Sequence, residues 1–401
     1  MAHPTPSSAR VGAKPGRPAL RVADVFRRYG AEFAASAVLT PAQHKVLRAV
    51  SSCRTEALGG HLDRCTDCGF EKPSYNSCRD RHCPGCQAFA ARKWLEARMA
   101  RVLPTHHFHV VFTLPSQLRP LALRNGEVVF PILLRGAAEV LSRLGEQRLG
   151  AQLGVTTVLH TWTRAMQFHP HVHCVVTGGG LALGGQGWKP TSRSFLFPVA
   201  VMRTLFRGIV RERLKEAFET GQLDLGGCCA PFAEPGAFGR LLRSLYVKRW
   251  VVYSKPPFAG VDQVFAYMAR YTHRVAISDH RLVAIEDDGV TFKTKDGGTT
   301  TLAPTEFIRR FLLHVLPAAF HKIRHYGLYA SANVNGRLQQ ARGVLGIDEG
   351  RPPPAERQAP DEVESSDPVA RQCPACHVGA LRRLPLLLRR PAAAPSAWDT
   401  S

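Results

Sequence analysis

The residues most suited to chemistry in this sequence are cysteines that occur in pairs. Cys65 and Cys68 form one Cys-x-x-Cys pair, and Cys83 and Cys86 form a second pair further along the chain. Zinc is held in proteins by four thiolate or imidazole ligands in a tetrahedron, and two such pairs supply all four. Because four cysteine ligands leave no position for a reacting water, this pattern predicts a structural zinc site.

The same stretch holds further residues that could bind a metal. A second zinc site could be built from four of them, namely Cys53, His61, Cys78 and His82. The alternative is that they are buried thiols and surface imidazoles, and the spacing leaves both open. A later pair, Cys373 and Cys376, is half of a zinc site without a second pair nearby, so its partners could lie in another chain.

A second group of candidate ligands is the segment His-Pro-His-Val-His, which contains His169, His171 and His173. Alternate residues of a strand face the same side, so His171 and His173 point together while the valine between them points toward the core. Two neutral imidazoles can hold a divalent metal and leave positions open for substrate oxygens. Paired histidines could also line a polar groove without a metal. His107 and His109 have the same spacing. Spacing alone therefore does not exclude His107 and His109 as the metal-binding pair.

Two tyrosines could act as nucleophiles. Tyr267 and Tyr271 lie four residues apart in the expected helix Val261–Thr272, so both phenols could reach one site. Such a pair is often only part of an amphipathic stripe, but Arg270 and Arg274 suit a groove lined by phosphates. A tyrosine attacking phosphorus forms a covalent link, and a cation on the paired histidines would offset the developing charge. This combination predicts an enzyme that cuts and rejoins nucleic-acid strands.

The overall charge agrees with a polyanionic partner. The chain has 401 residues, with 53 lysines and arginines against 31 aspartates and glutamates, for a net charge of +22. Nucleic acid is the first candidate and an anionic membrane surface the second. Arg79 and Arg81 beside the cysteines are expected to contact DNA, although a solvated basic face is the alternative.

The cellular location of the protein is predicted from the absence of recognisable membrane-spanning and signal-peptide segments. No run of about 18 apolar residues suggests a transmembrane helix, and the first 20 residues lack the apolar segment of a signal peptide. We therefore expect a cytoplasmic, nucleoid-associated bacterial protein whose cysteines are reduced. Clustered cysteines in a reducing compartment favour metal binding over disulfides.

The elements that must position these residues divide the chain into four parts. Residues 1–20 are expected to be disordered, 21–102 to form a zinc-binding DNA-contact domain, 103–345 to form the catalytic domain, and 346–401 to form a flexible tail with one Cys-x-x-Cys. Helices are expected at Ala42–Val50, Ala88–Val102, about 128–148, 198–221 and Glu306–Leu316. Strands are expected near 107–115, 169–180 and 246–254, with a pair of hairpins over 280–302.

Several segments, in order along the chain, are similar to transposases of the insertion-sequence-91 (IS91) family, which belong to the His–hydrophobe–His (HUH) rolling-circle nucleases. The resemblance covers residues 25 to 345. The segments are CRTEALGGHLDRC at 53–65, NSCRDRHCPGCQ at 76–87, HFHVVFTLP at 107–115, LHTW at 159–162, HPHVHCVVTGGG at 169–180, YMARYTHRVAIS at 267–278 and FIRRFLLHVLPAAFHKIRHYG at 307–327.

The resemblance implies an α+β fold, with an N-terminal zinc-binding module and an HUH-type antiparallel sheet flanked by helices. It implies that His171 and His173 bind catalytic magnesium or manganese, and that 107–109 is the family's first-strand motif. Tyr267 and Tyr271 would be the nucleophiles. They would nick single-stranded DNA at the ends of the mobile element, and also act on target DNA, leaving a 5′-phosphotyrosine and a free 3′-hydroxyl in rolling-circle transposition.

The sequence leaves several points open. The third metal ligand usual in this class could be His160, His169 or His273. A plasmid replication initiator or relaxase would use the same chemistry, and a decayed copy would be a non-catalytic DNA-binding protein. A transposase with an acidic metal triad would leave the histidine strand unexplained. The tail from residue 350 falls outside the resemblance.

Overall fold

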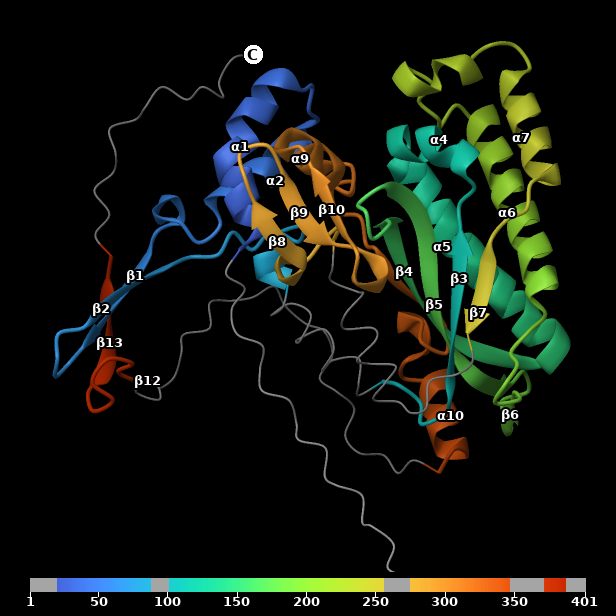
Figure 1. Ribbon diagram of the computed structural model, residues 1–401. Coiled ribbons are helices and arrows are strands. Elements are labelled where there is room, and N and C mark those ends of the chain that lie inside the picture. The colour runs from blue at the N-terminus through green and yellow to red at the C-terminus, as the bar shows by residue number, and fades with distance from the viewer. Residues whose placement is uncertain (1–19, 88–100, 256–274, 347–370, 387–401) are drawn as a thin grey trace, which may run out of the picture.

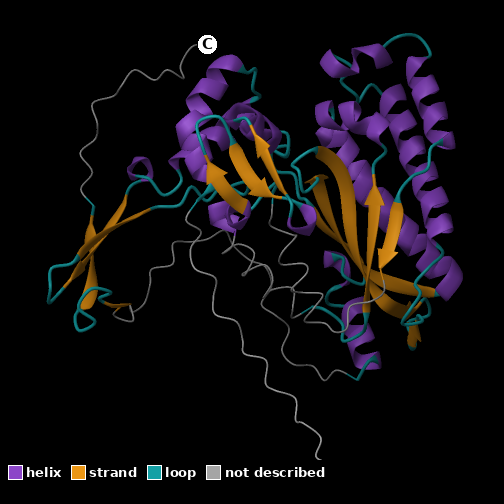
Figure 2. Ribbon diagram, in the orientation of Figure 1, coloured by secondary structure: helices purple, strands orange, loops and turns teal. Residues whose placement is uncertain are grey.

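The computed structural model describes residues 20–87, 101–255, 275–346 and 371–386. These residues form helices and three antiparallel sheets, which confirms the expected α+β class (Figures 1 and 2). None of the described helices is long and apolar enough to cross a membrane. Several sequence predictions lie outside the described residues. They are the disorder of residues 1–19, most of the helix Ala88–Val102, and the helix Val261–Thr272 with Tyr267, Arg270, Tyr271 and, just beyond it, Arg274.

The largest sheet has the strand order β11-β4-β5-β3-β7, with β6 paired to β5. Its two long central strands, β4 and β5, are joined over most of their length, and every neighbouring pair is antiparallel. The strands are β3 (His107–Thr113), β4 (Ala151–Trp162), β5 (Phe168–Ala182), β6 (Trp188–Pro190), β7 (Val252–Lys255) and β11 (Ile323–Gly327). The two strongest strand predictions, at 107–115 and 169–180, thus become neighbours in this sheet.

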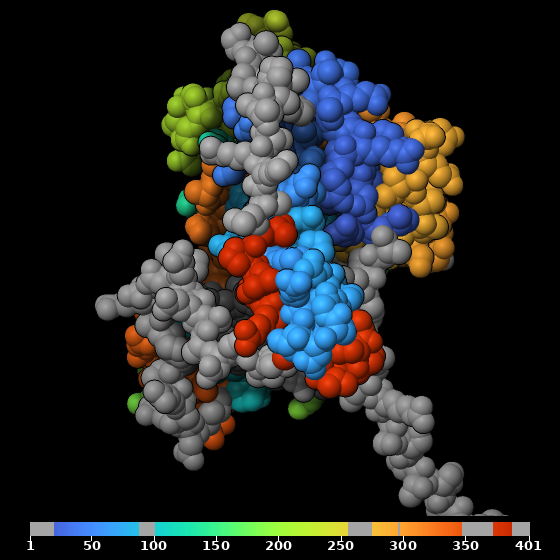
Figure 3. Space-filling model, turned by 90° about the vertical axis from the view of Figure 1, so that its left-hand side faces the viewer, coloured from blue at the N-terminus to red at the C-terminus, as the bar shows by residue number. Residues whose placement is uncertain are grey.

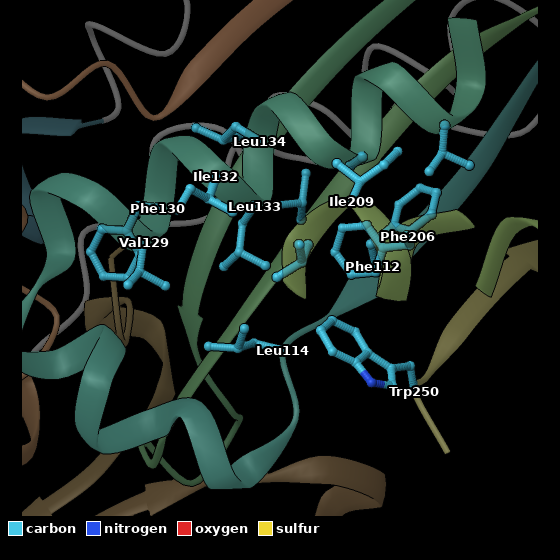
Figure 4. Close-up of a cluster of buried hydrophobic side chains, with 14 of the residues drawn as sticks. Phe112, Leu114, Val129, Phe130, Ile132, Leu133, Leu134, Phe206, Ile209 and Trp250 are labelled. Atoms are coloured by element: carbon cyan, nitrogen blue, oxygen red, sulfur yellow. The ribbon is translucent and has the colours of Figure 1, made fainter. Parts of the chain in front are cut away.

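Helices cover one face of this sheet (Figure 1). α5 (Gly126–Leu144) and α6 (Val199–Glu219) pack against each other, and α4 (Arg119–Arg124) and α7 (Ala237–Val247) extend the layer. Phe112 of β3 and Phe206 of α6 have ring centroids 4.8 Å apart, and the Trp250 ring packs on Phe206 (Figure 4). Burying each such side chain contributes about 2 kcal/mol to the free energy of unfolding, so this apolar layer fixes the position of the sheet.

A second hydrophobic core joins the start of the chain to residues 275–312. α1 (Val22–Ser36) contacts α9 (Pro304–Leu312), where the rings of Phe26 and Phe311 lie 5.1 Å apart. The strands of this unit are β8 (Leu282–Ile285), β9 (Val290–Lys293) and β10 (Thr299–Leu302), which meet at the expected hairpin turns. The zinc-binding and catalytic parts, expected as consecutive domains, therefore share a core formed from distant segments.

The helix α2 (Pro41–Ser52) begins where the sequence predicts. Pro41 occupies its first turn, and the Thr40 hydroxyl accepts a hydrogen bond from the backbone N–H of Gln43 at 3.3 Å. The Gln43 side chain accepts one from the Thr40 backbone N–H at 3.0 Å, which completes a reciprocal cap. This cap sets the direction of the helix, and its C-terminal end at Cys53 leads directly into the cysteine-rich segment.

The third sheet has the order β12-β13-β1-β2 and joins opposite ends of the described chain (Figure 1). β1 (Gly60–Cys65) and β2 (Glu71–Tyr75) form a hairpin, and β13 (Ala380–Pro385) pairs with β1 while β12 (Arg371–Gln372) pairs with β13. Residues 371–386 are therefore an ordered strand pair and differ from the flexible tail expected over 346–401. The pairing partner lies about 320 residues away, so no local pattern signals it.

Candidate metal centres

The face of the large sheet opposite the helices carries histidines. On β5, His171 and His173 are partly exposed, while Val172 and Cys174 between and beyond them are fully buried in the core against the helices. This alternation follows from the two-residue period of a strand, as the sequence predicts. The two imidazoles therefore lie side by side on a polar surface supported by a rigid apolar layer.

His160 joins this pair from the neighbouring strand. The register of β4 on β5 places His160 directly opposite His171, and one ligand nitrogen from each of His160, His171 and His173 lies within 4.8 Å of the others. Of the other third-ligand candidates, His169 has its Nδ1 3.0 Å from the Arg119 guanidinium, which donates to it. His273 lies outside the described residues. The structure thus brings together three of the histidines that the sequence singled out.

Hydrogen bonds orient the cluster. The Nδ1 atom of His171 donates to the backbone carbonyl of His169 at 2.7 Å, so its Nε2 carries the lone pair that a metal needs. The Nδ1 atom of His173 lies 2.8 Å from Nε2 of His109. The two histidines of the alternative metal pair, His107 and His109, therefore have different surroundings. His109 contacts the cluster from β3. His107 instead donates to the Thr105 carbonyl and accepts from the Tyr329 hydroxyl.

Although His171 and His173 are partly exposed, the protein packed around their rings desolvates them and keeps these imidazoles neutral. Desolvation lowers the pKa of His171 to about 4 and that of His109 to about 4. Desolvation also lowers the pKa of His173 well below its ordinary value, and the neighbouring histidines and Lys255 add to this shift. Neutral imidazole is the form that binds a metal, so His171 and His173 are in their ligand form at neutral pH.

The donor set is suited to a divalent metal with open positions. Three imidazole nitrogens leave part of the coordination shell for water or phosphate oxygens. Magnesium prefers oxygen ligands, whereas imidazole suits transition metals, so manganese fits this set better than magnesium. The indole of Trp162 stacks on His160 with ring centroids 4.5 Å apart and further restrains that side chain.

A cluster of four cysteines lies at the N-terminal core. It comprises Cys53, Cys78, Cys83 and Cys86, with Sγ atoms of Cys53 and Cys78 each 3.5 Å from that of Cys86. A tetrahedral zinc with Zn–S bonds of about 2.3 Å separates its sulfurs by about 3.8 Å. Cys53 and Cys83 are buried within the second hydrophobic core. This cluster, called the core cluster below, has the composition of a closed structural zinc site.

The grouping of the cysteines differs from that expected from their spacing. Cys83 and Cys86 do not meet Cys65 and Cys68, which instead lie with Cys373 and Cys376 in a second group of four thiols. The physical reason is the β1–β2 hairpin. Cys53 and Cys78 lie near its base, whereas Cys65 ends β1 at the tip, and the five residue steps of this strand span about 17 Å.

The two histidines proposed for a second zinc are engaged elsewhere. His82 places Nδ1 3.0 Å from Asp80, and its Nε2 accepts a hydrogen bond from the backbone N–H of Leu316. His61 has its Nε2 3.4 Å from Asp63. Neither belongs to a metal-binding group in the described residues, so only Cys53 and Cys78 of that set join a cluster.

The arginines expected to bind DNA differ in their surroundings. The guanidinium of Arg81 donates to the backbone carbonyls of Phe320 and Pro317, both at 2.6 Å. Arg81 therefore ties the cysteine segment to the chain that leads into β11. Arg79 is exposed, with a left-handed φ of 54°. Arg270 and Arg274 lie outside the described residues.

Comparison with known proteins identifies two matching family models. Residues 154–336 match a family described as "Putative transposase", and residues 25–114 match one described as "Transposase zinc-binding domain". The first region contains His160, His171 and His173, and the second contains the core cluster. Cys373 and Cys376 lie in neither.

Two curated relatives are similar over much of their length. "Putative transposase y4qJ" of Sinorhizobium fredii is 45% identical over 396 residues, which cover 95% of this chain and 98% of the relative. "Transposase for insertion sequence element IS801" of Pseudomonas savastanoi pv. phaseolicola is 29% identical over 289 residues, covering 70% of this chain and 68% of the relative. No solved structure matches the chain significantly.

Proposed function

This chain belongs to the IS91 family of transposases and contains that family's zinc-binding domain, and from this premise we propose that it is a metal-dependent tyrosine nuclease and strand transferase. It would nick single-stranded DNA at the element ends in rolling-circle transposition. The observation that carries the proposal is the cluster of His160, His171 and His173 on the face of the large sheet opposite α5 and α6.

The histidines have the role of metal ligands in this proposal. His171 and His173 would hold manganese or magnesium, with His160 as the third ligand. The metal, when bound, would polarise the scissile phosphate and offset its developing charge. His109 would position His173 through their 2.8 Å contact, and the carbonyl of His169 would hold the His171 ring in the productive tautomer.

The tyrosines would carry out the exchange of phosphate bonds. The phenol oxygen of Tyr267 or Tyr271 attacks phosphorus and loses its proton to solvent, while the bond from phosphorus to the 3′ oxygen breaks. That oxygen takes up a proton and leaves as a 3′-hydroxyl, and the 5′ phosphate stays on the tyrosine. Attack by another 3′-hydroxyl reverses the exchange and joins strands. The second tyrosine would allow a second cut while the first stays loaded.

The transposase assignment also bears on the alternatives. Both relatives are named as transposases, which favours transposition over plasmid replication or conjugative relaxation by the same chemistry. DNA is accordingly the partner, and Arg79, Arg270 and Arg274 are proposed to contact its phosphates. The intact histidine cluster supports catalysis over a decayed DNA-binding copy.

The test is cleavage of labelled single-stranded DNA from the element's own terminus with manganese or magnesium. Tyr267→Phe, Tyr271→Phe and the double variant would be run beside wild type on a denaturing protein gel, with Tyr246→Phe, an exposed tyrosine on α7, as the matched control. We expect a labelled protein–DNA band in wild type and the control that is absent from the double variant. A band that persists in the double variant contradicts the proposed nucleophiles.

A further inference from the structure

Four thiols from opposite ends of the chain meet at the tip of the β1–β2 hairpin. Cys65 and Cys68 come from that hairpin, and Cys373 and Cys376 come from the turn between β12 and β13. We propose that these four cysteines form a second structural zinc site, called the tip cluster, which fastens the C-terminal strand pair to the N-terminal hairpin. Two of its ligands lie outside the zinc-binding domain matched at residues 25–114.

The distances between the sulfurs fit a metal. The Sγ atoms of Cys65 and Cys376 are 3.7 Å apart, and those of Cys68 and Cys373 are also 3.7 Å apart. A tetrahedral zinc with bonds of about 2.3 Å requires about 3.8 Å between sulfurs, whereas a disulfide requires about 2.05 Å. Each close contact joins one cysteine of the N-terminal pair to one of the C-terminal pair, so the two pairs interlock around one point.

Both turns present their sulfurs in the same way. The backbone N–H of Asp67 donates to Sγ of Cys65, and the backbone N–H of Ala375 donates to Sγ of Cys373, each at 3.4 Å. In both cases the donor is two residues after the cysteine. Hydrogen bonds from backbone N–H groups stabilise a thiolate, the form of cysteine that binds a metal. Two turns remote in sequence thus share one ligand geometry.

The C-terminal turn is also shaped to approach the N-terminal thiol closely. A Cβ atom added to Gly379 would lie 2.5 Å from Sγ of Cys65 and 2.9 Å from the carboxyl carbon of Asp67. Only a residue without a side chain fits there. The backbone N–H of Gly379 donates to Sγ of Cys376 at 3.4 Å, so this glycine contacts both halves of the tip cluster.

The sheet that holds these cysteines requires a stabilising cross-link. In the described part of the chain, none of the hydrophobic clusters includes a residue of β1, β2, β12 or β13. Without a metal, backbone pairing, with Cys65 opposite Leu381, and a hydrogen bond from the Ala380 N–H to the Thr66 hydroxyl hold the strands together. Small units without a hydrophobic core depend on metals or disulfides for stability. Figure 3 shows the C-terminal strands, in red, packed against the N-terminal hairpin, in light blue.

The first test counts zinc by elemental analysis of the purified full-length protein. We expect two zinc ions per chain in wild type, one in Cys373→Ser/Cys376→Ser, and two in the control Cys228→Ser, which alters an exposed cysteine outside both clusters. Two zinc ions in the double variant, or a single zinc in wild type, would overturn the proposal. The count does not depend on DNA cleavage, so its outcome is separate from that of the proposed nuclease activity.

A second test keeps all cysteines and does not depend on the folding of a variant. A protease recognition sequence is inserted between Ala355 and Glu356, and the protein is cut and passed through a sizing column. The fragment from residue 356 to the C-terminus should stay bound with zinc present and separate once a chelator has stripped the metal. Separation with zinc in place, or retention after both zinc ions are removed, would contradict a metal-held C-terminus.

Discussion

The histidine cluster and the two cysteine clusters show two ways in which one chain can arrange metal ligands. The histidine cluster offers three nitrogens on the sheet face opposite α5 and α6, and a metal held by them would keep coordination positions for a substrate. Each cysteine cluster offers four sulfurs, which fill a tetrahedron. The first arrangement suits chemistry and the others suit structure. Changes to the two kinds of cluster should therefore have separable effects on cleavage and on stability.

The largest effect on stability is expected at the core cluster. Cys83→Ser removes a ligand that is only 1% exposed, so the variant should lose one zinc and about 5 kcal/mol or more of the free energy of unfolding. Zinc analysis and thermal unfolding measure both. Cys174→Ala, a fully buried cysteine outside the clusters, is the matched control and should keep its zinc. Equal destabilisation of both variants, with unchanged zinc content, would contradict a structural role for zinc at the core cluster.

The largest effect on cleavage is expected at the histidine cluster. The variant His171→Ala/His173→Ala should cut single-stranded DNA on the order of 1,000-fold more slowly, because the charge on the scissile phosphate is no longer offset. Its zinc content and melting temperature should stay near wild type. His107→Gln changes a histidine of the same sheet outside the cluster and serves as the control. Cleavage by the double variant at the wild-type rate would contradict the metal assignment.

Acid should destabilise the fold through buried histidines that lie outside the histidine cluster. Burial lowers the pKa of His107 and of His314 to about 4, while both would titrate near 6.5 when unfolded. Between these values the unfolded chain binds protons that the folded chain does not, so stability present above pH ~6.5 is lost as pH falls toward about 4. Each histidine should account for about 3 kcal/mol over that range.

This pH dependence is measured by urea unfolding at pH 7.5 and 4.5, conditions chosen to bracket most of the transition. His314→Gln should show a smaller difference between the two pH values than wild type, with cleavage at neutral pH retained. An identical pH dependence in the variant would mean that His314 is not held neutral by the fold.

A smaller effect on cleavage is expected from His109, which contacts a proposed ligand without being one. His109→Ala should weaken manganese activation by about 10- to 100-fold, because His173 loses the partner that orients its ring. A titration of cleavage against manganese should show a higher half-saturating concentration and a maximal rate closer to wild type. A lower maximal rate with unchanged manganese affinity would instead assign His109 a direct role in the reaction.

The comparison also shows what sequence reasoning could reach. The shared direction of the His171 and His173 side chains follows from the two-residue period of a strand. It can be predicted without knowing the rest of the chain. The choice of His160 depends on how β4 aligns with β5, which is a non-local property. The cysteine pairs were visible, but their grouping depends on a hairpin that separates Cys65 from Cys83 and on strands near the C-terminus. The contacts of Arg81 with residues 317 and 320 could not be predicted either, because they join parts of the chain that are far apart in sequence.

In the proposed reaction, a tyrosine of this transposase becomes covalently linked to the 5′ end of the cut strand. The most direct measurement is peptide mass spectrometry of the protein–DNA adduct after nuclease and protease digestion. We expect a nucleotide phosphate on Tyr267 or Tyr271, formed with manganese and absent from His171→Ala/His173→Ala. A nucleotide on a different residue, or cleavage without any covalent adduct, would contradict it.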